Sequence, residues 1–216
     1  MDTIETIMTT RAIRRFTDQP VSDADIATCL QAAQQAPSGG NVQPQQYYVF
    51  TEPDRKAEVA RWYLAAFDRY EATLDAPREF RDERARRSWE RTRDASRHLA
   101  DTLQDVPVIV MVLQAKIPWQ PRDEQGPMDI GRLDASVYPA VQNFCVAARS
   151  LGLGTALTTV IRVYGDEALA AVGVPPDKFE IAALIPVGYP AGNFGVAPRK
   201  PASAVTHWNH WGDKRR

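Results

Sequence analysis

The 216-residue chain is poor in metal-binding and nucleophilic side chains, with only two cysteines and three histidines. Cys29 and Cys145 stand alone without a C-x-x-C spacing, which argues against a disulfide framework and against a structural zinc site. His98, His207 and His210 have no G-x-S-x-G motif beside them, and the spacing H-W-N-H is not H-E-x-x-H. These absences disfavour hydrolytic triads and zinc-protease chemistry.

The chain also lacks an excess of one charge and a long apolar run. Its 26 basic and 27 acidic residues leave a net charge of −1, without the chain-wide basic field of nucleic-acid binders. The longest apolar run, 106–113, is far shorter than the roughly 20 residues that span a bilayer. The N-terminus, MDTIETIMTT, has neither the basic nor the apolar region of a signal peptide. We therefore expect a cytoplasmic protein that binds neither nucleic acid nor a membrane.

The composition is that of an ordinary globular protein. Hydrophobic residues make up 44% and charged residues 25%, and the length suits one large domain. No internal repeat and no Gly/Ser linker divides the chain. We expect a single domain over residues 1–216 that ends in an irregular tail from about residue 191.

Apolar periodicity and turn residues predict more helices than strands. The predicted helices cover residues 2–10, a stretch from the Ser22–Asp25 capping box to Pro37, 51–67, 78–97, 133–151 and 166–172. The predicted strands are 47–50, 106–113, 154–160 and 180–190. Because the order lacks the regular alternation of a doubly wound sheet, we expect an α+β fold with helices covering a sheet.

Two polar segments have simple interpretations. Residues 78–97 hold eight arginines and five acids, mostly three or four positions apart, which predicts a solvated helix with many ion pairs. Residues 116–128 hold three prolines and a glycine, which favours a long mobile loop. Neither segment indicates a nucleic-acid surface, because no stacking aromatics or known motif accompanies it.

Three separate stretches could together form a site for an anion and a planar ring. TTRAIRRF at 9–16 places three arginines within five positions, PSGGNVQP at 37–44 is a glycine-rich loop with amide side chains, and Arg199 and Lys200 come late. Guanidinium groups suit phosphate oxygens, while glycine backbone and amides suit the edges of a heterocycle. The simpler alternative is that the early arginines complement the dipole of the helix they follow.

These motifs resemble the FMN-dependent nitroreductase family. RAIRRF, Pro20–Val21, APSGGNVQPQ, LGLGT and PRKP…HW occur in the family's order, from about residue 3 to 211. The resemblance implies a nitroreductase-like α+β fold with a mixed central β-sheet flanked by helices. It also implies an intertwined homodimer, in which the tail of about 191–216 is extended and wraps the partner subunit.

The resemblance further implies an FMN site at the subunit interface, built by both chains. Its expected contacts are Arg11, Ala12 and Arg14 from one chain, Pro37, Ser38, Gly39 and Asn41 from the partner chain, Leu157, Thr158 and Thr159 near flavin N5, and Arg199 and Lys200 at the phosphate. The flavin performs the chemistry, so no catalytic side chain is expected. Arg15 is expected to be a surface charge. The chain departs from the family pattern at Ala12, commonly Ser, and at Gln45, commonly aromatic.

The implied function is an FMN-dependent oxidoreductase of the NAD(P)H nitroreductase type. Such enzymes take hydride from NADPH or NADH and then reduce a small flat nitroaromatic or quinone-like acceptor in a ping-pong cycle. Alternatives are the same fold with other flavin chemistry, as in a flavin destructase, dehalogenase or dehydrogenase, and a non-catalytic flavin-binding protein whose 78–97 segment serves a partner. Residues 62–80 and the loop around Trp119 are candidates for acceptor selection, although core or dimer packing is the simpler role of Trp62 and Phe67.

Overall fold

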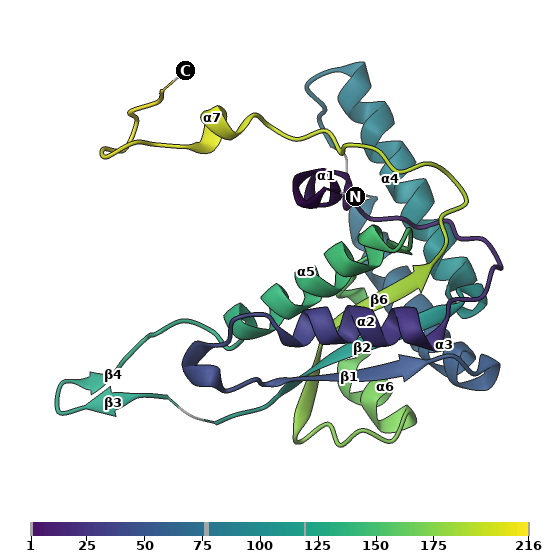
Figure 1. Cartoon of the computed structure of the whole chain (residues 1–216), viewed down its shortest axis with the longest axis horizontal. Coiled ribbons are helices and arrows are strands. Elements are labelled where there is room, and N and C mark those ends of the chain that lie inside the picture. The colour runs from purple at the N-terminus through teal and green to yellow at the C-terminus, as the bar shows by residue number, and fades with distance from the viewer. Residues whose placement is uncertain (1, 76–77, 119, 216) are drawn as a thin grey trace.

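A computed structural model describes residues 2–75, 78–118 and 120–215. Its centre is a four-stranded sheet in the order β1-β2-β6-β5 (Figure 1). The strands are β1 (Gln45–Phe50), β2 (Val108–Ala115), β6 (Phe179–Gly188) and the very short β5 (Gly154–Thr155). This confirms an α+β fold with a helix-covered sheet.

Helices cover both faces of the sheet (Figure 1). On one face lie α2 (Asp23–Gln34) and α5 (Asp134–Ser150), and on the other lie α3 (Pro53–Glu71), α4 (Glu83–Thr102) and α6 (Gly165–Ala171). The helix α1 (Thr3–Thr9) packs on α5, and α7 (Ala202–Val205) lies in the tail. Short 3₁₀ turns are η1 (Gly39–Asn41), η2 (Ala72–Leu74), η3 (Leu103–Asp105) and η4 (Val160–Tyr164).

The apolar run of β2 is explained by burial of both its faces. Alternate side chains enter the two cores: Val108, Val110 and Val112 point toward α2 and α5, and Ile109, Met111 and Leu113 point toward α3 and α4. On β6, Ala182 is an extra residue, because Val112 pairs with Ala183 and Leu113 pairs with Ile181. Ala182 and Ala183 therefore both face the α2/α5 core, as expected at a β-bulge.

The predicted helix signals are present at the ends of α2 and α5. Ser22 Oγ accepts a hydrogen bond from the Asp25 N–H at 3.1 Å, which confirms Ser22 as the N-cap. It donates to the Asp25 carboxylate at 2.8 Å, in place of the backbone bond that would complete the predicted capping box. Gly152, at φ +80°, ends α5, and the Leu153 N–H turns back to the Ala148 carbonyl at 2.9 Å.

The prediction of a mixed sheet is wrong for the named strands, since all three ladders are antiparallel. The connection from β1 to β2 is a pair of antiparallel helices, α3 and α4, in which Arg93 and Arg97 reach back to Glu71. The first helix leads the chain away from the end of β1, and the second leads it back to the same end of the sheet. β2 therefore begins where β1 ends and runs antiparallel to it. In the described part of the chain, the only parallel contact is an isolated bridge between Ala12 and Thr155.

The strand predicted over 154–160 is too long. The ladder with β6 stops after Thr155, because the next residue, Ala156, lies opposite Pro186. The Ala156 N–H still reaches the Pro186 carbonyl at 3.4 Å, but proline has no N–H to donate in return. Residues 156–159 leave the sheet after a single bridge at Thr158, and η4 follows.

The arginine-rich segment is a solvated helix, as predicted, but it begins later and runs further than 78–97. The carboxylate of Asp82 caps α4 by accepting from the Ala85 N–H at 2.7 Å, which fixes the start at Glu83. Arg86 and Arg87 pair with Glu83 along the helix. Arg97 instead crosses to Asp68 on α3 at 2.6 Å.

The segment predicted as a long loop contains a small hairpin. The strands β3 (Arg122–Asp123) and β4 (Gly126–Pro127) pair antiparallel, and the hairpin projects from the body of the chain (Figure 1). Its turn is stabilised by Asp123, whose carboxylate accepts from the Gln125 N–H at 2.8 Å. Trp119, a candidate for acceptor selection, lies outside the described residues.

Both cysteines are free and buried, where a thiol packs as a small hydrophobic group. Burial raises the pKa of the Cys29 thiol to about 12 and also raises that of Cys145, so both stay protonated at neutral pH. Over residues 2–75, 78–118 and 120–215, no helix is long and apolar enough to cross a membrane, and no group of acidic, histidine and cysteine side chains could hold a metal ion.

The N-terminal segment after α1 lies against β5 in a contact that admits no side chain on Gly154. A Cβ placed on Gly154 would lie 2.9 Å from Cβ and Cγ2 of Ile13. The Ile13 N–H donates to the Thr155 carbonyl at 2.8 Å, so the two segments are joined by backbone as well.

We therefore expect Gly154→Ala to lower the melting temperature. Overpacking of this kind costs about 1–3 kcal/mol, and roughly 2–4 °C is lost per kcal/mol in a chain of this size. The matched control is Gly165→Ala, at a helical residue where nothing lies within 4 Å of the added Cβ. Equal melting temperatures for the two variants would contradict the close packing of Ile13 on Gly154.

Candidate functional site

The break in the sheet after Thr155 opens a cavity of about 360 Å³ between three segments. One is the N-terminal segment with Arg14, another is 156–160, and the third is the α3–α4 hairpin. The lining residues are Arg14, Tyr63, Phe67, Tyr70, Leu74, Arg78, Trp89, Thr92, Arg93, Ser96, Leu99, Ala156, Leu157, Thr158 and Val160. Apolar and aromatic walls with a few polar groups, in a volume of this order, are typical of small-molecule sites.

Arg14 lines this cavity as a half-buried cation without a carboxylate partner. No ion pair of Arg14 occurs among the residues that the structure describes. Burial lowers the pKa of Arg14; Tyr63 acts to raise it, and the charge of Arg11 adds to the lowering. A partly desolvated guanidinium is normally paired, so Arg14 fits a site for an anionic group that another molecule supplies.

Tyr63 and Thr158 join the α3 wall of the cavity to the 156–159 segment. Their hydroxyl oxygens lie 3.3 Å apart. Burial raises the pKa of Tyr63, while the hydrogen bond with Thr158 and the charge of Arg14 lower it. This places a neutral phenol, a threonine hydroxyl and a guanidinium around one side of the cavity.

The backbone of 156–159 presents hydrogen-bond donors on the side away from the sheet. The N–H groups of Ala156 and Thr158 donate to carbonyls of β6. For the alternate residues Leu157 and Thr159, no acceptor of the N–H group occurs within the described ranges. Both residues are exposed, so these two donors are available to the polar edge of a ligand.

The 37–41 loop, which was predicted to contact the flavin ring, is held in one conformation by hydrogen bonds. Its residues do not line the cavity. Ser38 Oγ accepts from the Gln43 N–H at 2.8 Å, and the Gly39 N–H donates to Ser136 Oγ at 3.0 Å. Asn41 and Gln43 have positive φ, +55° and +48°, which is uncommon outside glycine. Pro37, Gly39 and Asn41 are exposed.

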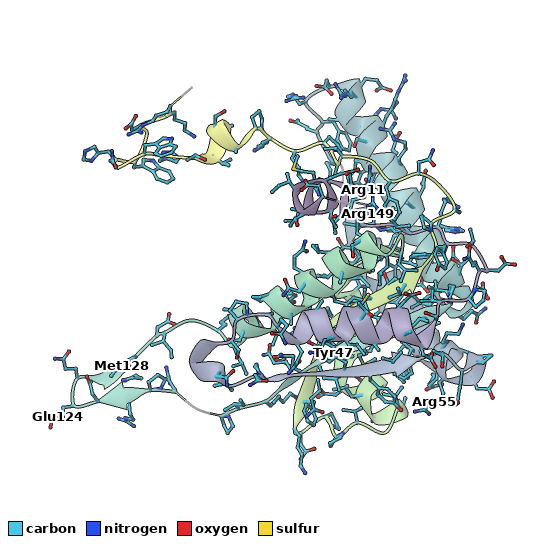
Figure 2. All side chains as sticks on the ribbon, in the orientation of Figure 1. Arg11, Tyr47, Arg55, Glu124, Met128 and Arg149 are labelled. Carbon is cyan, nitrogen blue, oxygen red and sulfur yellow. The ribbon has the colours of Figure 1, made fainter. Side chains whose placement is uncertain are left out.

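Figure 2 shows that this loop and Arg11 lie well apart within one chain. The loop is the turn that follows α2, whereas Arg11 follows α1. One subunit alone therefore brings together Arg14, Leu157 and Thr158, with Ala12 bridged to Thr155, but does not add Pro37, Ser38, Gly39 or Asn41.

The two late basic residues are exposed and do not line the cavity. The Arg199 guanidinium donates to the carbonyl of its own neighbour, Pro198, at 3.0 Å. Lys200 follows it in the extended segment after β6. Their role at a phosphate stays a prediction. The predicted flavin contacts of Arg11 and Thr159 also stay predictions, since both residues are exposed and neither lines the cavity. Arg15 is exposed, in line with a surface charge.

A buried arginine that the sequence did not single out, Arg149, joins the end of α1 to the start of the tail (Figure 2). Its Nε donates to Thr9 Oγ1 at 3.0 Å, and its guanidinium lies 3.8 Å from the ring centroid of Phe194. In sequence Arg149 is the basic residue of the last helical turn of α5, a position explained by the helix dipole alone.

The sequence missed Trp89 as a cavity residue, because it looked like part of a solvated helix. Tyr63 and Arg78 also line the cavity, and both lie in the 62–80 segment that was predicted as a candidate for acceptor selection. Only the antiparallel contact of α3 with α4 brings them to one cavity.

These residues fit FMN by the chemistry of their donors. Arg14 offers a guanidinium to an anion, while Leu157 and Thr159 offer backbone N–H groups of the kind that match the ring edge of a flavin. Aromatic side chains line the remaining wall beside the space for a flat ring.

Comparisons with known proteins indicate the family of the chain. A model of the Nitroreductase family matches residues 7–189. The chain is 28% identical over 208 residues to an FMN reductase (NADPH) of Bacillus subtilis, covering 96% of this chain and 74% of that protein. It is 28% identical over 209 residues to an oxygen-insensitive NADPH nitroreductase of Salmonella typhimurium, covering 97% and 74%.

The fold agrees as well. A crystal structure of a protein assigned as a nitroreductase, in complex with FMN, from Desulfovibrio desulfuricans superposes with a TM-score of 0.68 at 24% identity, covering 98% of both chains. With the family model matching from α1 through the end of β6, this chain belongs to the Nitroreductase family.

Proposed function

We propose that this protein is an FMN-dependent oxidoreductase that takes hydride from NADPH or NADH and reduces nitroaromatic or quinone-like acceptors by a ping-pong mechanism. The observation that carries the proposal is the half-buried guanidinium of Arg14, which has no carboxylate partner among the described residues and lines the cavity. The names of the relatives, an FMN reductase and an NADPH nitroreductase, support the choice of cofactor and reductant.

Bound FMN supplies the electron chemistry, and for a nitro acceptor the balance is NAD(P)H + H⁺ + ArNO₂ → NAD(P)⁺ + ArNO + H₂O. The protein binds and orients. Arg14 holds an anionic part of the cofactor, and the N–H groups of Leu157 and Thr159 hold the ring edge. The aromatic residues of the α3–α4 hairpin exclude water from the ring face.

The active form that we propose is a homodimer. The apolar side chains of Ile4, Ile7 and Met8 on α1 are about half or more exposed in the described part of the chain. The tail with α7 extends away from the body of the chain (Figure 1) and exposes Trp211 at 91%. A second subunit that covers these surfaces would also supply the Pro37–Asn41 loop, which one chain does not bring to its own cavity.

The purified protein should be yellow, with a flavin absorbance spectrum that NADPH or NADH bleaches under anaerobic conditions. Adding a nitroaromatic or a quinone should restore the oxidised spectrum. A colourless protein that does not take up added FMN would refute the proposal. A flavin that reductant cannot bleach would favour a non-catalytic flavin-binding protein, and consumption of free reduced flavin with oxygen would favour other flavin chemistry.

Arg14→Ala should weaken FMN binding at least about tenfold, because a hydrogen bond to a charged group contributes about 1.5–3 kcal/mol. The matched control is Arg15→Ala, which removes an exposed charge from the adjacent position. The measurement is the FMN dissociation constant by fluorescence titration of the apoprotein. Equal losses in both variants, or a larger loss for Arg15→Ala, would contradict the role of Arg14.

Light scattering should give twice the mass of one chain. Ile7→Glu, which places a charge on an apolar residue that is 48% exposed and lies outside the chain's own core, should shift the mass toward one chain and lower FMN occupancy. Thr3→Glu is the control, since Thr3 is exposed and starts the same helix. A wild-type monomer that holds FMN would overturn the dimer proposal.

A further inference from the structure

The outer wall of the cavity combines an indole ring with a guanidinium of no assigned role. The Arg78 guanidinium lies 5.2 Å from the ring centroid of Trp89 on α4, and both residues line the cavity. Phe80 packs on the same indole, with ring centroids 5.6 Å apart. Tyr70 and Leu74, at the end of α3 and in η2, line the cavity beside them.

The arginines around this wall differ in whether a carboxylate neutralises their charge. Arg93 also lies over the Trp89 ring, at 5.6 Å, but its guanidinium is bound to Glu71 at 3.0 Å and to Asp75 at 2.8 Å. Arg97 is held in the same way by carboxylates of α3 and α4. Arg78 forms no ion pair with any carboxylate within residues 2–75, 78–118 and 120–215.

This difference matters because two carboxylates lie close to Arg78 in the sequence and neither pairs with it. Asp75 is three positions from Arg78 and is occupied by Arg93, and Glu79 is adjacent but makes no ion pair with Arg78. The cavity wall thus presents the positive charge of Arg78 beside an aromatic surface. This charge is additional to that of Arg14, which comes from a distant part of the sequence. An arginine stacked on an indole keeps its fork of donors directed outward, where it suits bidentate binding of a carboxylate.

We propose that the preferred acceptor is an aromatic compound with an anionic substituent such as a carboxylate, that Arg78 binds this substituent, and that Trp89 and Tyr70 flank the ring. This rests on the proposed function, because it assigns the acceptor of the same cavity. Since Arg78 is not among the flavin contacts proposed above, Arg14 and the backbone of Leu157, we assign it to acceptor specificity and not to holding the cofactor.

The test compares 4-nitrobenzoate with the neutral 4-nitrobenzyl alcohol in steady-state reduction by NADPH, using the protein with its FMN bound. Arg78→Gln should lower kcat/KM for 4-nitrobenzoate at least about tenfold, mainly through KM, and change kcat/KM for the alcohol less than about twofold. Arg78→Lys keeps the positive charge but not the forked pair of donors, so its kcat/KM for 4-nitrobenzoate should lie between the values of the wild type and Arg78→Gln. Arg91→Gln is the matched control, because Arg91 is an exposed arginine of α4 that does not line the cavity.

Binding supplies a readout that does not depend on turnover. Calorimetric titration with benzoate should show binding to the wild-type protein that weakens with added NaCl and is reduced at least about tenfold in Arg78→Gln, whereas benzamide should bind both proteins equally. Equal losses for the charged and neutral compounds, or equal effects of Arg78→Gln and Arg91→Gln, would overturn this inference alone. Failure of wild-type protein to bind FMN or to accept hydride would instead overturn the proposed function, and benzoate binding would still report on Arg78.

Discussion

The uncompensated charge of Arg14 is the feature on which the candidate site depends. A guanidinium that is partly removed from water keeps its charge at a cost unless an anion is near, and the described chain supplies none. The fold holds it there through backbone contacts rather than through side-chain pairing, since Ile13 is joined to Thr155 and packs against Gly154. A charge held in this way is available for a ligand.

One proline limits the pairing of β5 with β6. Pro186 has no N–H to donate to the segment opposite, so the continuous ladder stops at Thr155 and resumes only as a single bridge between Thr158 and Leu184. Because backbone groups alternate along an extended segment, the N–H groups of Ala156 and Thr158 face β6, whereas those of Leu157 and Thr159 lie on the other side. This alternation provides the donors that we assign to a ring edge.

The ion pairs of α4 determine which arginines remain available to a ligand. Exposed pairs of this kind contribute little to stability individually, and Arg86 and Arg87 along the outer face of α4 are examples. Arg93 and Arg97 differ, because they join α4 to α3 and thereby position Trp89 and Tyr63 on two walls of one cavity. Their carboxylate partners are then occupied, and Arg78, beside Trp89, has no ion pair with a carboxylate of the described residues. Whether an arginine of this wall is available to a ligand therefore depends on which carboxylates the neighbouring arginines bind.

The sequence by itself determined the elements and the family. Capping at Ser22, the stop at Gly152 and the two-sided apolar run of β2 are local or periodic signals, and each was confirmed. The motifs around Arg14 and Leu157 also indicated two segments that the fold places on one cavity. Tertiary structure alone decided the antiparallel order of the sheet, the early end of β5 and the contribution of Trp89, whereas Tyr63 and Arg78 lie in the 62–80 segment predicted from sequence. Strand direction depends on how many helices return the chain, the end of β5 depends on a proline 30 residues away on another strand, and the cavity wall depends on a helix pair. None of these partners is adjacent in sequence, so no local pattern could report them.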